Sequence, residues 1–292
     1  MFGSVEELQE KLAACNYLTD RHVATIVYLA LKLQKPLLVE GPAGVGKTEL
    51  AKVLAQATNS RLIRLQCYEG LDEAKALYEW NYQKQLLRLY LAQAQKKDWE
   101  EAKQDIFTEE FLLTRPLLEA LLSKDPVVLL IDEVDKSDEE FESFLLELLS
   151  DYQVTIPELG TVKANHIPVV VLTSNSSREF GDALKRRCIH LYLDYPTFER
   201  ELNIIYLKVP GIKESLAKQI VSFVQALRKQ KLKKAPSIAE TIDWARSIIT
   251  LGSNIIDEEI VQNTLSILLK YQSDIEKVFS KIPSLLPENN LA

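Results

Sequence analysis

The sequence predicts an α/β domain built on a parallel sheet, followed by a smaller all-helical domain. A glycine-rich turn joins an apolar, strand-like segment at 37–40 to a helical segment. Two further apolar runs, at 127–133 and 168–175, end in polar residues, as strands buried on both faces do. The strand pattern stops near residue 196, whereas helical periodicity continues to about residue 281. We therefore expect an α/β domain at 1–196 and a helical domain at 197–292.

The N-terminal half of the first domain alternates between helices and strands. Apolar residues recur at three- and four-residue steps within 4–34, which predicts helices. A strand at 37–40, a helix to about residue 58 and an alternating strand at 61–65 follow. Residues 66–124 combine the segment CYEGLDEAKALYEWNY, charged helical sequence and an apolar helical pattern. We interpret them as an inserted excursion followed by a long helix in FTEEFLLTRPLLEALLSK.

The C-terminal half of this domain has clearer patterns. VVLLID is predicted to be a strand buried on both faces, and FESFLLELLSDY an amphipathic helix. QVTIPELGTVKANHIP indicates a hairpin that turns near Pro157 to Gly160. PVVVLTSN is a second buried strand with a polar end. Beyond residue 196, the helical patterns lie in ERELNIIYLK, LAKQIVSFVQALRK, IAETIDWARSIITLG and IVQNTLSILLKYQSDIEKVF.

The glycine-rich turn fits the phosphate-binding pattern G-x-x-x-x-G-K-[ST], with a strand before it and a helix after it. Glycine lets the backbone N–H groups approach a phosphate, and the start of a helix adds further N–H groups. Lys47 is expected to reach the β- and γ-phosphates, and the Thr48 hydroxyl to ligate Mg²⁺. The predicted nucleotide-binding residues are Gly41, Pro42, Ala43, Gly44, Val45, Gly46, Lys47, Thr48 and Glu49.

Two acids close the strand at 127–132. Asp132 is suited to hold Mg²⁺ beside Thr48, and Glu133 to accept a proton from an attacking water. The competing interpretation is that Asp132, Glu133 and Asp135 are ordinary acids at a strand end. The phosphate-binding loop upstream favours the catalytic interpretation, with ATP and Mg²⁺ as cofactors.

Three further residues are candidates for the same chemistry. Asn175 ends the next strand, at the sheet edge where ligands gather, and can orient the water or touch the γ-phosphate. Arg186 and Arg187 form a basic pair from which one arginine can reach the nucleotide of a neighbouring subunit. Arg187 is the preferred choice of the two. The alternatives are a turn-forming asparagine and a solvated basic turn.

Composition limits the remaining functions. The formal net charge is −7, and the basic clusters at 185–187 and 228–234 are short, which weighs against nucleic acid as the main partner. Three widely spaced cysteines argue for a reducing compartment, and three histidines without ligand spacing argue against a transition-metal site. With neither an apolar run long enough for a membrane span nor a secretory signal, the expected location is the cytoplasm.

Taken together, these motifs resemble those of the AAA+ ATPases and, within them, the MoxR group. GPAGVGKT is similar to Walker A, LLIDEVDKS to Walker B, LTSN to sensor 1 and LKRRC to the arginine-finger segment. The hairpin before LTSN resembles the one that marks the MoxR and helix-2-insert branch. RLQCYEGLDEAKALYEWNY is similar to the CoxD-like branch. The resemblance covers about residues 15–275.

The resemblance implies a fold and a way of working. It implies a P-loop αβα core, a helical lid, and a homo-hexameric ring that uses ATP to remodel another protein. It also implies a von Willebrand factor A domain partner and a client, with a role in maturation or metal-centre insertion of a molybdenum enzyme such as carbon monoxide dehydrogenase. The excursion at 66–82 would face the pore or its rim, with Tyr68, Tyr78, Trp80 and Tyr82 either contacting the client or packing in the core.

One position departs from the family pattern. Many MoxR proteins carry a sensor 2 arginine in a Ser-Pro-Arg context, whereas Ala239 stands at the similar position here. Arg246, two helical turns later, is the candidate substitute. Two alternative functions stay open: a nucleic-acid motor or loader of the same fold, and a P-loop small-molecule kinase. Glu133 and the paired arginines weigh against the kinase, because they suit water attack at a site shared between subunits.

Overall fold

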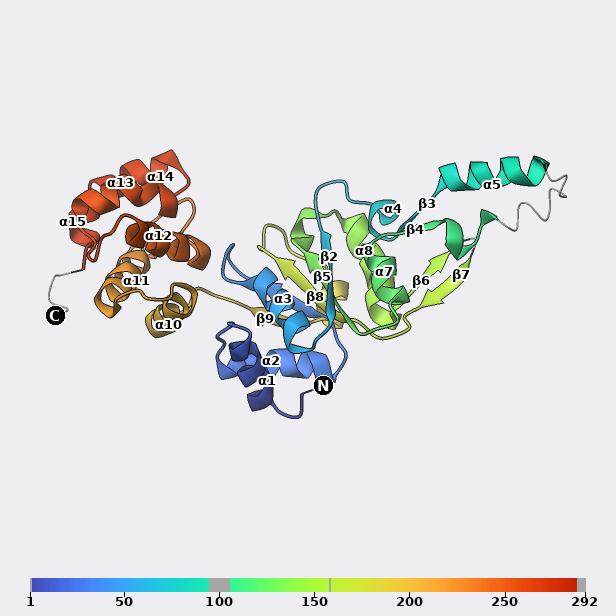
Figure 1. The fold of residues 1–292 in the computed structure, drawn as a ribbon, viewed down its shortest axis with the longest axis horizontal. Helices are drawn as coiled ribbons and strands as arrows, with labels where there is room; N and C mark the ends of the chain where they lie inside the picture. Colours follow the sequence, from blue (N-terminus) through green and yellow to red (C-terminus); the bar gives the residue numbers. More distant parts are fainter. Residues whose placement is uncertain (1, 95–105, 158, 288–292) are drawn as a thin grey trace. The chain divides into compact units, whose positions relative to one another are not determined.

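The computed structural model describes residues 2–94, 106–157 and 159–287 (Figure 1). The chain divides into two compact units. The first comprises Met1–Lys11, Asp20–Glu40 and Thr48–Tyr192. The second comprises Leu12–Thr19, Gly41–Lys47 and Leu193–Ala292. The division into domains at residue 196 stays a prediction.

The first unit contains the predicted parallel sheet. Its five strands have the order β2-β5-β8-β1-β9, and each neighbouring pair is parallel. The strands are β1 (Leu37–Glu40), β2 (Arg61–Gln66), β5 (Val127–Asp132), β8 (Val169–Ser174) and β9 (Ile189–Tyr192). Because all five run the same way, the polar residues that end β5 and β8 meet at one edge.

Burial explains why these segments are strands. All six residues of β5 are buried, since the strand lies inside the sheet and is covered on both faces. β2 lies at the edge of the sheet and alternates between exposed and buried side chains. The helices outside the insertion are α1 (Val5–Ala14), α2 (Arg21–Lys32), α3 (Lys47–Ala57), α8 (Glu139–Asp151) and α9 (Asp182–Arg187).

The prediction of one long helix within 107–124 is wrong. A 3₁₀ turn, η1 (Glu109–Phe111), and a short strand, β4 (Leu112–Thr114), precede a helix, α7, that covers only Pro116–Leu122. Proline disfavours helical backbone in the residue before it, and Arg115 is extended (φ −96°, ψ 170°). β4 pairs antiparallel with β3 (Tyr78–Trp80), so a long-range contact decides its conformation.

The rest of the excursion contains α4 (Glu73–Ala76) and α5 (Tyr82–Ala94). Figure 1 shows α5 extending beyond the β3–β4 pair. Trp80 is buried and contacts Tyr78 and Phe107 edge-on, so it packs in the core. Tyr68 and Tyr82 are exposed.

The predicted hairpin is present before β8. Strands β6 (Gln153–Ile156) and β7 (Gly160–Lys163) pair antiparallel, with Val154 opposite Val162. Val154 and Ile156 are buried in the core of the first unit. The turn therefore falls at the predicted place, although residue 158 lies outside the described residues.

The C-terminal region of the second unit is helical, as the sequence predicts. A buried ion pair between Arg228 and Glu201, 2.6 Å apart, and the packing of Phe223 on Trp244 stabilise it. The helices are α10 (Phe198–Lys208), α11 (Glu214–Arg228), α12 (Ile238–Thr250), α13 (Glu258–Leu268), α14 (Gln272–Phe279) and α15 (Ile282–Leu285). Among the described residues, every helix is too short or too polar to cross a bilayer.

Candidate nucleotide-binding site

The glycine-rich loop connects β1 to α3 and requires glycine. Gly41 and Gly44 have positive φ angles of 145° and 75°, which side-chain-bearing residues rarely adopt. A Cβ on Gly41 would lie 2.0 Å from the carbonyl oxygen of Leu193, and one on Gly44 would lie 2.3 Å from the Cβ of Ser237. The loop therefore has the bare, tightly turned backbone that a phosphate cradle needs.

Lys47 begins α3 and its side chain folds back over this loop. The Nζ atom donates to the carbonyl oxygens of Gly41 and Pro42 at 2.6 and 2.7 Å, and the residue is only 6% exposed. The ammonium group is thus held above the loop rather than in solvent. Glu49, also predicted to bind the nucleotide, is half-exposed and lies 3.7 Å from Lys52.

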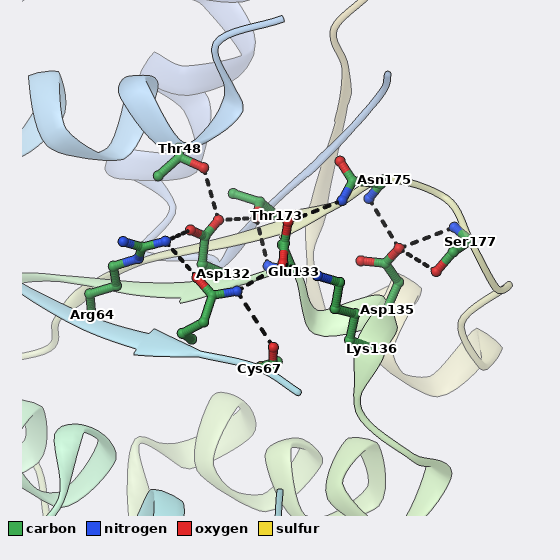
Figure 2. A network of polar contacts seen from close by, with 11 residues as sticks. Thr48, Arg64, Cys67, Asp132, Glu133, Asp135, Lys136, Thr173, Asn175 and Ser177 are labelled. Atoms are coloured by element: carbon green, nitrogen blue, oxygen red, sulfur yellow. Dashed lines mark hydrogen bonds and ion pairs between the residues drawn. The ribbon is translucent and has the colours of Figure 1, made fainter. Parts of the chain in front are cut away.

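Thr48, Asp132 and Thr173 form the centre of the site (Figure 2). The Thr48 hydroxyl donates to Oδ1 of Asp132 at 2.9 Å, and the Thr173 hydroxyl donates to the same oxygen at 2.5 Å. Asp132 is only 2% exposed. The first turn of α3 and the ends of β5 and β8 therefore converge on one buried carboxylate.

Glu133 leaves β5 in a left-handed backbone conformation, with φ 56° and ψ 47°. This backbone conformation is energetically unfavourable for non-glycine residues, and it recurs at functional sites. The backbone N–H of Glu133 donates to the Thr173 hydroxyl at 2.9 Å. Lys136, in the 3₁₀ turn η2 (Val134–Lys136), donates to Oε2 of Glu133 at 2.5 Å, and Asn175 Nδ2 donates to Oε1 at 3.5 Å. The structure thus brings the predicted Glu133 and Asn175 together.

Two residues of β2 that belong to no predicted motif complete this polar network. Arg64 Nη2 lies 2.6 Å from Oδ2 of Asp132, and Gln66 Nε2 donates to Oε2 of Glu133 at 2.9 Å. The signal was weak: an exposed Arg and Gln at alternate positions of an edge strand. Only the register of β2 against β5, which places Gln66 opposite Asp132, brings them to the acids.

Asp135, which the sequence suggests only as an ordinary acid at the strand end, anchors the segment that carries Asn175. Its Oδ2 accepts hydrogen bonds from the backbone N–H groups of Asn175 and Ser177 and from the Ser177 hydroxyl. Burial raises the pKa of Asp135, but the hydrogen bonds from Ser177 and Asn175 outweigh burial and leave it below its ordinary value of 3.8. Asp135 is therefore held as the charged acceptor that fixes this turn.

Cys67 follows Gln66 in the chain and is buried near the same acids. Burial, with the negative charges of Asp132, Asp135 and Glu133, raises the pKa of its thiol to about 12. The thiol therefore stays protonated and unreactive beside the acids.

The predicted arginines lie away from this network within one chain. Arg187 ends α9, where its Nε donates to the Ser150 hydroxyl and its Nη1 donates to the carbonyl oxygen of Ala183 at 3.0 Å. Arg186 is exposed. Within one chain, Arg187 therefore contacts Ser150 and Ala183 rather than the acids.

The region expected to carry sensor 2 lies in the second unit. Ser237 and Glu240 form a capping box at the start of α12, with Ala239 in its first turn. Arg246, the candidate substitute, is half-exposed, donates to the carbonyl oxygen of Lys208 and lies 4.0 Å from Asp243. Its contacts are thus with neighbouring helical residues.

The donor set fits a magnesium nucleotide. Thr48 and Asp132 offer two adjacent oxygen donors, and Mg²⁺ in nucleotide enzymes takes one or two protein oxygens and completes its shell with phosphates and water. Within the described part of the chain, no group of three or more His, Cys, Asp and Glu residues could hold a metal by itself.

Comparisons with known proteins agree with this geometry. Residues 36–188 match the family model described as AAA domain (dynein-related subfamily). An uncharacterized protein of Staphylococcus haemolyticus is 27% identical over 241 residues, covering 80% of this chain and 83% of its own length. The chaperone protein ClpB of Bacillus cereus is 32% identical over 138 residues, which cover 46% of this chain but only 13% of ClpB.

The fold has a counterpart among solved structures. The Holliday junction branch migration motor RuvB of Thermotoga maritima aligns with 86% of this chain and 70% of its own, with a TM-score of 0.52 and 17% identity. At that identity the likeness shows the fold alone. The predicted AAA+ fold is confirmed. The chain belongs to the AAA domain (dynein-related subfamily) family and is an ATPase of the AAA+ type.

Proposed function

We propose that this chain is a MoxR-type AAA+ ATPase that hydrolyses Mg²⁺-ATP to remodel or mature a partner protein. The observation that carries the proposal is the hydrogen bond between Thr48 and Asp132, with Glu133 next along the chain. It brings the end of a phosphate-binding loop to the acidic end of a buried strand, which is the combination that ATP hydrolysis needs.

Each residue has a role that its position supports. Lys47 and the loop at 41–48 would bind the phosphates, while Thr48 and Asp132 would hold Mg²⁺, whose charge favours attack on the γ-phosphate. Glu133 would accept the proton of the attacking water, and Asn175, within 3.5 Å of it, would orient that water.

A ring would complete the site. Arg187, with Arg186 as the second choice, sits at the exposed end of α9 and would approach the nucleotide of an adjoining copy. We infer a homo-hexamer, working in the cytoplasm, from the resemblance to MoxR-type ATPases. The short contacts of Arg187 to Ser150 and Ala183 would be exchanged for contacts to phosphate on assembly.

The substrate of the ring would be another protein. The β6–β7 hairpin before β8 supports the MoxR assignment, and the match to ClpB, named a chaperone, supports work on proteins. A von Willebrand factor A domain protein would be the partner. The remodelling would serve metal-centre insertion into a molybdenum enzyme such as carbon monoxide dehydrogenase.

Measuring ATP hydrolysis against protein concentration tests this proposal. A site completed by a neighbouring arginine should gain specific activity as the chain assembles, with sedimentation tracking the same transition. A small-molecule kinase would instead show constant specific activity and require a cosubstrate. Stimulation by DNA or RNA, rather than by a protein partner, would favour the nucleic-acid motor and overturn the assignment.

A further inference from the structure

Arg64 is an exposed arginine on an edge strand, yet its guanidinium meets a buried carboxylate. One nitrogen, Nη2, lies 2.6 Å from Oδ2 of Asp132 and donates to Oε1 of Gln66 at 2.5 Å. The Arg64 side chain is 48% exposed, whereas that of Asp132 is 2% exposed. The arginine therefore reaches from the surface into the centre of the site (Figure 2).

The register of the sheet explains this reach. Gln66 lies opposite Asp132 in the β2–β5 pair, and Arg64 lies opposite Leu130. Because side chains alternate along a strand, those of Arg64 and Gln66 emerge on the same face of β2. Arg64 must therefore extend diagonally along the strand to meet Asp132, and it passes Gln66 on the way.

The contacts form a continuous chain between the two acids. Arg64 links Asp132 to the amide oxygen of Gln66, and the amide nitrogen of Gln66 donates to Glu133 at 2.9 Å. Donation from Arg64 also fixes which end of the Gln66 amide faces Glu133. A buried carboxylate needs a charge partner, and Arg64 supplies one to Asp132 without occupying Oδ1, the oxygen that Thr48 contacts.

We propose that Arg64 is a positioning residue that, directly and through Gln66, sets the orientation of Asp132 and Glu133 for Mg²⁺-dependent ATP hydrolysis. This inference rests on the proposed function. Arg64 touches neither nucleotide nor water in this account; it acts through the groups that do. Partners of this kind typically change metal affinity or activity by about 10- to 100-fold when removed.

The test compares Arg64→Met with Arg61→Met. Arg61 lies on the same strand and pairs with Glu119 at 2.5 Å, so the control removes an equivalent surface arginine from a contact outside the site. The expected result is that Arg64→Met loses about 10- to 100-fold in kcat/KM, through a lower kcat and weaker binding of Mg²⁺-ATP. Arg61→Met should hydrolyse ATP like the wild type, and a single cooperative thermal unfolding transition shows that each variant is folded.

A second readout does not depend on turnover. Calorimetric titration with ATP, in Mg²⁺ and in EDTA, measures how much the metal strengthens binding. In EDTA, Arg64→Met should bind ATP with the affinity of the wild type. In Mg²⁺, it should lose most of the increase in ATP affinity that the metal provides. Arg64→Lys, which keeps the charge but not the branched donor geometry, should restore part of that gain.

A double-mutant cycle tests the path through Gln66. If Arg64 acts partly through Gln66, the variant with Arg64→Met and Gln66→Leu should lose less activity than the product of the two single losses. Should Arg64→Met fail to fold, Arg64→Lys and Gln66→Leu carry the same comparison.

Two results overturn the inference alone. The first is that Arg64→Met hydrolyses ATP as fast as an active wild type. The second is that Arg64→Met and Arg61→Met lose the same amount of ATPase activity. A wild type that neither binds nor hydrolyses ATP would instead remove the proposed function, and this inference with it.

Discussion

The hydroxyl of Thr48 lies 2.9 Å from Oδ1 of Asp132, although 84 positions separate the two residues in the chain. One ends the phosphate-binding loop and the other ends β5. Their meeting depends on parallel strands that deliver their carboxyl ends to one edge of the sheet. The predictions that follow test what this arrangement does.

Replacing Lys47 with alanine should abolish measurable ATP binding. Its buried Nζ is already positioned over the loop, and each charge-assisted hydrogen bond to phosphate that is lost costs about 1.5 to 3 kcal/mol, or roughly 10- to 150-fold in affinity. Titration with a fluorescent ATP analogue measures the effect. Lys52→Ala, an exposed lysine of the same helix, is the matched control, and unchanged affinity in Lys47→Ala would remove the phosphate-loop assignment.

Glu133→Gln should bind ATP normally and hydrolyse it about 10²- to 10⁴-fold more slowly, because the amide cannot accept the proton of the attacking water. The side chain keeps its shape, and its one amide oxygen can still accept from Lys136, whereas Asn175 loses its acceptor. Single-turnover hydrolysis and a binding titration on the same sample separate the two steps. Glu140→Gln, exposed in the first turn of α8, should behave as the wild type. Normal turnover in Glu133→Gln would show that the base lies elsewhere.

Arg187→Ala should keep ATP binding and lose about 10³- to 10⁵-fold in kcat, as expected for an arginine that stabilises the transition state from a neighbouring subunit. Mixing this variant with Glu133→Gln subunits should restore activity, since some interfaces then combine an intact arginine with an intact base. Arg186→Ala measures the second candidate in the same way. If Arg187→Ala hydrolyses ATP at the normal rate, this residue is not the finger.

Asp135→Asn should lower the free energy of unfolding by about 1 to 2 kcal/mol at pH 7, since a neutral acceptor replaces a charged one in hydrogen bonds from Ser177 and Asn175. The folded pKa of Asp135 lies below 3.8, so its stabilisation is complete above that pH and is lost as the pH falls through the folded pKa. Urea unfolding of wild type and variant should therefore converge at low pH. Asp125→Asn, an exposed acid, is the control, and a gap that is constant with pH would contradict this role.

Local sequence predicted the elements whose burial is uniform or whose spacing is strict. VVLLID is apolar along its length because β5 is covered on both faces, and the hairpin at 153–163 has alternating residues around a turn. The glycine pattern predicted the loop because only glycine tolerates the close approaches at Gly41 and Gly44. These features are visible without knowing what lies next to them.

Contacts between distant segments were not predictable from the sequence alone. Leu112 to Thr114 carry helical spacing, but their pairing with Tyr78 to Trp80, more than thirty positions away, makes them a strand. The roles of Arg64 and Gln66 depend on strand register, and the left-handed backbone of Glu133 is imposed by its surroundings. The network around the acids therefore emerges only from the folded sheet.

A structure of Glu133→Gln with ATP and Mg²⁺ tests the central claim most directly. The account predicts the triphosphate within the loop at 41–48, with the metal bound through Thr48 and, directly or through water, Asp132. It also predicts Arg187 of an adjoining copy near the γ-phosphate. A nucleotide bound away from Lys47, or a metal held without Thr48 and Asp132, would contradict it.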